Sequence, residues 1–330
     1  MSMSSSNTVP DTAPAVTAAT VPATRPFFWS VKREIWEHGS VYIAPAAVAG
    51  LVLVGFVISL FGLARHEKEI RETLTPDSFA AVAVLPYDIA AITLIVVSVI
   101  VGFFYCLGSL YNERRERSIL FWKSLPVSNT TTVLSKAFVP LAVLPLIAFA
   151  ALLVLHLVML GLNVAGRAVV GANVGELLAN VPLLQMDVAL LYGFVALALW
   201  HAPIYAWFIL VSGWAKKAPF LWGVLPPLAL IIVEQVGFGT KYVARLVNYR
   251  LAGAMDAAFS KPVVLPMHAL HAHVAKNPGA HRGADGVPVF GIAQIDLVHF
   301  LSTPGLWAGL IVAAALLAAA VWMRRTREAI

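Results

Sequence analysis

Six long apolar stretches dominate the pattern of hydrophobic and polar residues along this chain. Each is close to or longer than the roughly 18–20 residues that a helix needs to cross a bilayer. None shows the alternation typical of a membrane β-barrel strand, so helices are the expected spanning form. We therefore predict an all-α, polytopic membrane protein. Its six transmembrane helices are expected at residues 41–63, 89–111, 137–162, 183–213, 219–237 and 304–323.

The segments outside these stretches differ in character. Residues 1–24 are rich in Ser, Thr, Ala and Pro and lack the basic start and apolar core of a signal peptide, so a disordered cytoplasmic tail is expected. Residues 26–38 place aromatic residues on one helical face and charged residues on the other, which indicates an interfacial helix or an extension of the first span. Residues 238–303 are expected to form an extracytoplasmic subdomain within one membrane domain, residues 25–330.

The distribution of basic residues predicts the orientation of the chain in the membrane. Thirteen Lys and Arg residues flank one side of the predicted spans, whereas the two short connections on the other side carry four. Both termini are therefore expected in the cytoplasm. The 238–303 connection carries six more, but it is longer than the loops to which this rule applies. The net charge of +6 follows from this asymmetry, and no separate basic face indicates nucleic-acid binding.

A charged segment at residues 112–136 separates the second and third spans. At helical spacing, Ser118, Phe121, Trp122 and Leu125 share one face, and Pro126 is expected to end that helix. Ser128 or Asn129 is then placed to cap the following helix. The pattern alone leaves two alternatives open: a short helix that binds another protein, or a basic loop whose aromatic residues touch lipid headgroups.

This segment resembles the cytoplasmic coupling loop of type-2 ABC (ATP-binding cassette) exporter permeases. Glu113-Arg114, Pro126-Val127-Ser128 and Lys136 fit the family pattern, with Arg117 where the family usually has Gly. The resemblance implies a coupling helix at residues 112–130 that docks on a separate ATPase. It also implies a homodimer with two ATPase copies in a bacterial inner membrane. The ATPase-contacting residues implied in this way are Glu113, Arg114, Arg115, Glu116, Arg117, Ser118, Phe121, Trp122, Leu125 and Pro126.

The chain itself contains no Gly-x-x-x-x-Gly-Lys-[Ser/Thr] phosphate loop. We therefore expect no cofactor in this chain, and ATP with Mg²⁺ in the partner ATPase. Four histidines in the 238–303 connection do not have the spacing of a closed zinc site, so no metal site is predicted. They are His268, His271, His273 and His281.

Ionisable residues and prolines inside the predicted spans form a second set of candidates. Polar side chains are costly in lipid, so they either line a substrate path or gate, or make buried contacts between helices. Two further hypotheses remain open: an intramembrane enzyme that uses His201 or Glu234, and a non-transporting membrane anchor or sensor. Pro226-Pro227 is expected to break the fifth span. The candidate path or gate residues are His156, His201, Pro203, Pro226 and Glu234.

Overall fold

The computed structural model describes residues 24–73, 76–116, 127–260 and 291–326. These residues form helices and no strand; a single isolated bridge joins Phe259 to Ile295. The predicted all-α membrane fold is confirmed, with six helical stretches long and apolar enough to cross a bilayer. These are Ser40–Phe61, Ala83–Arg115, Asn129–Val169, Val174–Trp214, Pro219–Phe238 and Pro304–Thr326.

Helices and short helical turns account for most of the described residues. The first four helices are α1 (Thr24–Glu37), α2 (Ser40–Thr73), α3 (Pro76–Ser109) and α4 (Tyr111–Arg115). Next come α6 (Asn129–Phe138), the π-helical turn η1 (Val139–Val143), α7 (Leu144–Val169), α8 (Val174–Asn180) and α9 (Leu183–Trp214). The last group comprises α10 (Pro219–Val233), the π-helical turn η2 (Glu234–Phe238), α11 (Tyr242–Ala258), the 3₁₀ turn η4 (Ile292–Gln294), α13 (Leu297–Ser302) and α14 (Pro304–Thr326).

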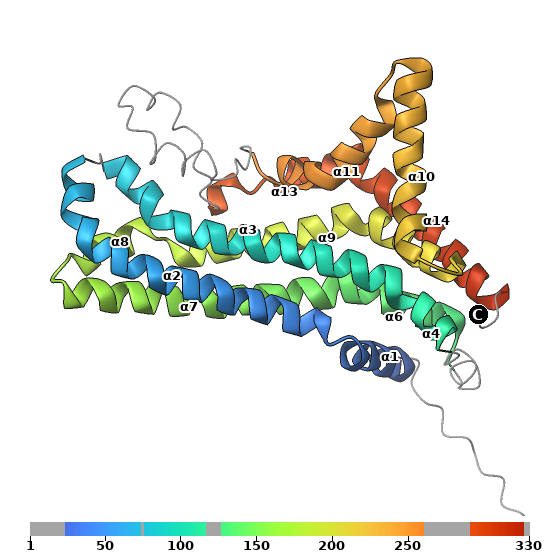
Figure 1. The fold of residues 1–330 in the computed structure, drawn as a ribbon, viewed down its shortest axis with the longest axis horizontal. Coiled ribbons are helices and arrows are strands. Elements are labelled where there is room, and N and C mark those ends of the chain that lie inside the picture. Colours follow the sequence, from blue (N-terminus) through green and yellow to red (C-terminus); the bar gives the residue numbers. More distant parts are fainter. Residues whose placement is uncertain (1–23, 74–75, 117–126, 261–290, 327–330) are drawn as a thin grey trace, which may run out of the picture.

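A bundle of long helices forms the main body. Helices α2, α3, α7 and α9 run side by side, and α14 packs along α9 (Figure 1). Helix α9 is apolar all round and contributes fully buried Leu190, Phe194 and Trp200 to the core. One end of the bundle carries α1, α4 and the end of α14, and we call it the α4 end. The opposite end carries α8 and is called the α8 end (Figure 1).

Helix α10 leaves the bundle steeply, and α11 returns toward it (Figure 1). Pro226 and Pro227 lie inside continuous α10, so the predicted break of the fifth span is wrong. The ring of Pro227 deprives the Gly223 carbonyl, four residues earlier, of its helical donor. Trp207 in α9 replaces that donor, because its Nε1 donates to the Gly223 oxygen at 2.9 Å. A side chain from a neighbouring helix thus keeps the proline-containing helix intact.

Two glycines of α14 lie beside side chains of α11. Arg250 in α11 donates from Nη2 to the Gly305 carbonyl at 2.5 Å, and its guanidinium lies 5.2 Å from the Trp200 ring. A Cβ atom on Gly309 would stand 2.5 Å from Arg250 Nη1, and one on Gly305 would clash with the Tyr249 hydroxyl. A side chain at either position would therefore force Tyr249 or Arg250 to move.

Candidate functional site

Segment 112–136 is fixed in the protein at its beginning and at its end. Glu113 lies in α4, Lys136 lies in α6, and both side chains are buried. The Lys136 Nζ stands 3.1 Å from Glu113 Oε1. A buried ion pair therefore joins the point where the chain leaves the second span to the point where it enters the third.

Two arginines complete the surroundings of the Glu113 carboxylate. Arg324, in the last turn of α14, donates from Nη1 to Glu113 Oε2 at 2.5 Å. Arg33, in α1, donates from Nη2 to Oε1 at 3.0 Å. Together with Lys136, three cations from three helices surround one carboxylate. Hydrogen bonds between charged groups are stronger than neutral ones, so this arrangement fixes the relative positions of the helices.

Glu34 in α1 is the second carboxylate at this end. Its Oε1 accepts from Lys136 Nζ at 2.8 Å and from Arg33 Nη2 at 2.6 Å. Its Oε2 accepts from the Tyr105 hydroxyl at 2.9 Å. Every oxygen of the Glu34 and Glu113 carboxylates therefore has a donor. We call this group the ion cluster, which consists of Arg33, Glu34, Glu113, Lys136 and Arg324.

The ion cluster holds charges at neutral pH. Burial alone would raise the pKa of the Glu34 carboxyl, because burial removes the hydration of the ionised form. The Lys136 ammonium and the Arg33 guanidinium outweigh burial and lower that pKa to about 2. Burial would likewise lower the pKa of Arg33, but the carboxylates of Glu34 and Glu113 raise it. Each partner thus keeps the other ionised.

Helix α1 turns its charged face toward the bundle. The helix predicted at residues 26–38 is confirmed as α1, but Glu34 on its charged face is fully buried. The aromatic residues Trp29 and Trp36 point away from the bundle and are exposed, and Lys32 Nζ lies 4.9 and 4.8 Å from their ring centres. The amphipathic pattern therefore reflects an ionic contact with the protein on one side and an aromatic surface on the other.

Arg114 fixes the second span to the end of α9. It is buried and donates from Nη2 to the carbonyls of Ser212 and Ala215 at 2.9 and 2.6 Å. The Ser212 carbonyl belongs to the last turn of α9 and the Ala215 carbonyl to the residue that follows it, where carbonyls lack a donor within the helix. The Leu110 amide also donates to Ser212 Oγ, at 3.3 Å. The start of segment 112–136 is thus bound to α9 as well as to the ion cluster.

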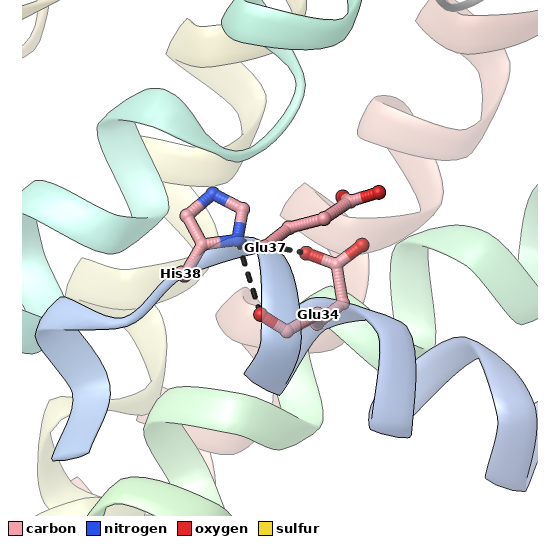
Figure 2. Close-up of side chains that lie close together, drawn as sticks. All are labelled: Glu34, Glu37 and His38. Carbon is pink, nitrogen blue, oxygen red and sulfur yellow. Dashed lines mark hydrogen bonds and ion pairs between the residues drawn. The ribbon is translucent and has the colours of Figure 1, made fainter.

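Glu34, Glu37 and His38 come close enough together to be considered as metal ligands. Their ligand atoms lie within 4.8 Å of one another, and Figure 2 shows the His38 ring beside Glu34. However, Glu34 already binds Lys136 and Tyr105, and His38 Nδ1 lies 3.2 Å from the Glu34 carbonyl oxygen. A cation would have to displace an ammonium 2.8 Å away, so these donors fit a hydrogen-bonded helix end and not a metal centre.

No family model, curated protein or solved structure matches this chain. A six-helix membrane architecture with a buried ion cluster at one end is what the molecule shows.

The ten residues implied to contact an ATPase divide into three groups. Glu113 and Arg114 face the protein interior. Arg115 and Glu116 are exposed, with 60% and 61% of their side-chain surface accessible, and they pair with each other at 3.6 Å. The remaining six lie outside the described residues: Arg117, Ser118, Phe121, Trp122, Leu125 and Pro126. The predicted cap at Ser128 is confirmed, because its Oγ accepts from the Thr131 amide at 3.0 Å.

The candidate path or gate residues do not meet in one place. His156 in α7 pairs with Asp187 near the α8 end. His201 and Pro203 are buried in α9, and His201 Nδ1 lies 2.9 Å from the Leu197 carbonyl oxygen. The Glu234 carboxylate accepts from the amides of Tyr242 and Val243, so it caps the start of α11. Pro226 lies within α10, and the four histidines of residues 261–290 lie outside the described residues.

Sequence reasoning did not single out Glu34 or Arg324 as site residues. Both lie in amphipathic or basic flanks beside predicted spans. The sequence feature that points to these residues is the presence of two carboxylates, Glu34 and Glu113, among the basic residues that flank one side of the membrane. Which cation binds which carboxylate depends on how α1, α6 and α14 pack, and no local pattern encodes that packing.

Proposed function

We propose that this chain is the permease subunit of an ABC exporter and that a separate ATPase drives it. The observation that carries this proposal is the buried connection between the two ends of segment 112–136, formed by Glu113 and Lys136. This segment resembles the coupling loop of that family. A loop with joined ends moves as a unit, so a force on it reaches both spans at once.

The ion cluster gives that force a route into the membrane domain. From Glu113, ionic contacts run to Arg33 in α1 and to Arg324 in α14, while Arg114 is bound to the end of α9. We propose that Glu113 and Arg114 transmit motion and do not touch the ATPase. Exposed Arg115 and Glu116, with the six residues from Arg117 to Pro126, would supply the contact. ATP binding and hydrolysis in the partner would then shift these helices as rigid bodies.

The remaining parts of the proposal come from the sequence. The excess of basic residues assigns the α4 end and both termini to the cytoplasm. ATP and Mg²⁺ belong to the ATPase, since this chain has no phosphate loop. Two copies of the chain would enclose the substrate path in a bacterial inner membrane. The substrate is unidentified.

The two alternative functions receive less support. An intramembrane enzyme would need free catalytic groups, whereas Glu234 caps α11 and His201 packs against Tyr205 and Phe103. A membrane anchor or sensor would have no use for a buried link between the ends of segment 112–136. That hypothesis predicts a function without any ATPase.

Purification of the tagged full chain in mild detergent tests the class of protein. The expected result is a stoichiometric ABC ATPase among the co-purifying chains, identified by mass spectrometry. Co-purification of no ATPase, with the chain intact and monodisperse, would contradict the proposal.

ATPase stimulation by reconstituted permease tests the coupling route. Trp122→Ala should abolish binding of the ATPase, and Glu113→Gln should preserve binding but reduce stimulation about 10-fold or more, because a force on segment 112–136 no longer reaches α14. Trp36→Ala and Glu37→Gln are matched controls: each removes the same residue type from an exposed position outside segment 112–136. Equal stimulation by Glu113→Gln and Glu37→Gln would exclude the ion cluster as the route.

A further inference from the structure

The turn that joins α9 to α10 combines exposed lysines with a pair of exposed tryptophans. Helix α9 ends at Trp214, α10 begins at Pro219, and Lys216 and Lys217 lie between them. The Trp214 and Trp222 rings meet edge-on with their centres 4.9 Å apart, and the two residues are 38% and 47% exposed. One short stretch of chain therefore presents two ammonium groups and two indole rings.

This turn lies at a membrane surface, because both helices that it joins are long and apolar enough to cross a bilayer. Residues 215–218 connect the end of one span directly to the start of the next. Trp is enriched at this level of a membrane, since indole has an apolar body and a polar N–H group. Exposed Phe220 and Leu221 follow in the first turn of α10. Charges at headgroup level are thus joined to side chains that suit acyl chains.

The two lysines differ from other basic residues at the α4 end. Lys136 and Arg324 bind buried carboxylates, and Arg114 binds backbone carbonyls. Lys216 and Lys217 are exposed instead, and the described residues form no ion pair with either of them. Their charges are therefore available to a ligand at the membrane surface.

We propose that the α9–α10 turn is a binding site for the headgroup of an anionic phospholipid. Lys216 and Lys217 attract the net negative charge of the headgroup, and the indole rings of Trp214 and Trp222 lie at the boundary with the acyl chains. A zwitterionic headgroup carries its own cation beside the phosphate and gains less from the lysines. A soluble anion gains nothing from the exposed aromatic and apolar side chains, so the surface fits a lipid.

The site adjoins the contact that attaches segment 112–136 to α9. Arg114 donates to the Ala215 carbonyl at 2.6 Å, and Lys216 is the next residue along the chain. A bound headgroup therefore restrains the turn from the membrane side, while Arg114 restrains it from the protein side. Lipid reaches this turn in the isolated chain, so the inference does not depend on an ATPase.

Native mass spectrometry of the purified full chain in detergent micelles measures the affinity for added phospholipids. The probes are phosphatidylglycerol and phosphatidylcholine with identical acyl chains. One lysine next to an anionic lipid strengthens binding about 5-fold, so Lys216→Gln combined with Lys217→Gln should weaken phosphatidylglycerol binding about 25-fold. The affinity for phosphatidylcholine should stay the same. Arginine at both positions should preserve the preference for phosphatidylglycerol, because the charges remain.

Lys241→Gln combined with Arg245→Gln is the matched control, because it removes two exposed charges from α11. This control should retain the affinity for phosphatidylglycerol. Equal losses in the two double variants would overturn the proposal, and so would a loss in neither.

Two further measurements separate a lipid from other occupants of the turn. Inorganic phosphate at the concentration of the lipid should not displace phosphatidylglycerol, whereas displacement would overturn the assignment to a lipid. The glutamine variant of Lys216 and Lys217 should still bind any ATPase that co-purifies with the parent. Loss of that ATPase with an unchanged affinity for phosphatidylglycerol would assign the turn to a protein contact and overturn the proposal.

Discussion

The α4 end and the α8 end of this bundle both bury ionisable side chains, but they neutralise them in different ways. At the α4 end, Glu34 and Glu113 accept from Lys136 at 2.8 and 3.1 Å, and two arginines complete their surroundings. At the α8 end, Asp187 has an imidazole at 2.7 Å, and Asp88 has no partner. Fixed cations balance the carboxylates at one end, whereas the described residues give Asp88 no hydrogen-bond partner at the other.

This difference separates an end held together by fixed ion pairs from an end with a buried acid that has no described hydrogen-bond partner. Carboxylates paired with Lys and Arg keep their charge throughout the neutral range, so the α4 end remains connected while the pH changes. Asp88, by contrast, has no described hydrogen-bond partner whose loss could break a contact. Removal of one acid should therefore cost more stability at the α4 end than at the α8 end.

Removal of one carboxylate from the ion cluster should give the largest effect. Glu113→Ala leaves Lys136, Arg33 and Arg324 facing one another without their shared counter-charge. Breaking a buried ion pair in this way costs about 3–5 kcal/mol of stability. Thermal unfolding in detergent measures the loss. Glu116→Ala, an exposed glutamate in the same segment, should cost less than about 1 kcal/mol.

Acid should weaken the α4 end in a defined range of pH. The pKa of Glu34 is lowered from 4.5 to about 2 in the folded protein, so its contribution is complete above pH 4.5. That contribution is lost as the pH falls toward 2, because the unfolded chain then binds the proton more readily. Unfolding temperatures measured against pH should show this loss in the parent and not in Glu34→Gln. Glu37→Gln should leave the loss in place, since burial raises the pKa of Glu37 instead.

A smaller effect is expected where segment 112–136 returns to the membrane domain. Ser128→Ala removes the oxygen that accepts from the Thr131 amide at the start of α6. Loss of such a cap costs about 1 kcal/mol. Ser128→Asp restores an acceptor and should recover most of the stability. A Ser128→Ala variant with unchanged unfolding would show that contacts of α6 with α1 and α14 alone fix this helix start.

The smallest effect should come from the unpaired acid. The Asp88 carboxyl has no described hydrogen-bond partner, so Asp88→Asn should change the free energy of unfolding at neutral pH by no more than about 1 kcal/mol. Thermal unfolding of the parent and the variant in detergent measures the change. A loss as large as that of Glu113→Ala would mean that Asp88 is charged and paired, which would remove the contrast between the two ends.

The sequence was sufficient to predict the membrane spans, but it was not sufficient to predict the contacts between them. Apolar length located all six membrane helices, and the Ser128 cap followed from local chemistry. The prediction that Pro226-Pro227 breaks the fifth span was wrong. The donor that replaces the missing backbone amide, Trp207 Nε1, lies in another helix. Glu34 and Arg324 were missed for the same reason: their partners lie 102 and 211 residues away along the chain.

Gly305 and Gly309 have the spacing that often brings two membrane helices together. In this chain, Tyr249 and Arg250 of α11 occupy that surface. The small-residue face of α14 is therefore closed to a neighbouring molecule as long as α11 stays in place. Any contact between two copies of the chain must use another surface, or must first displace α11.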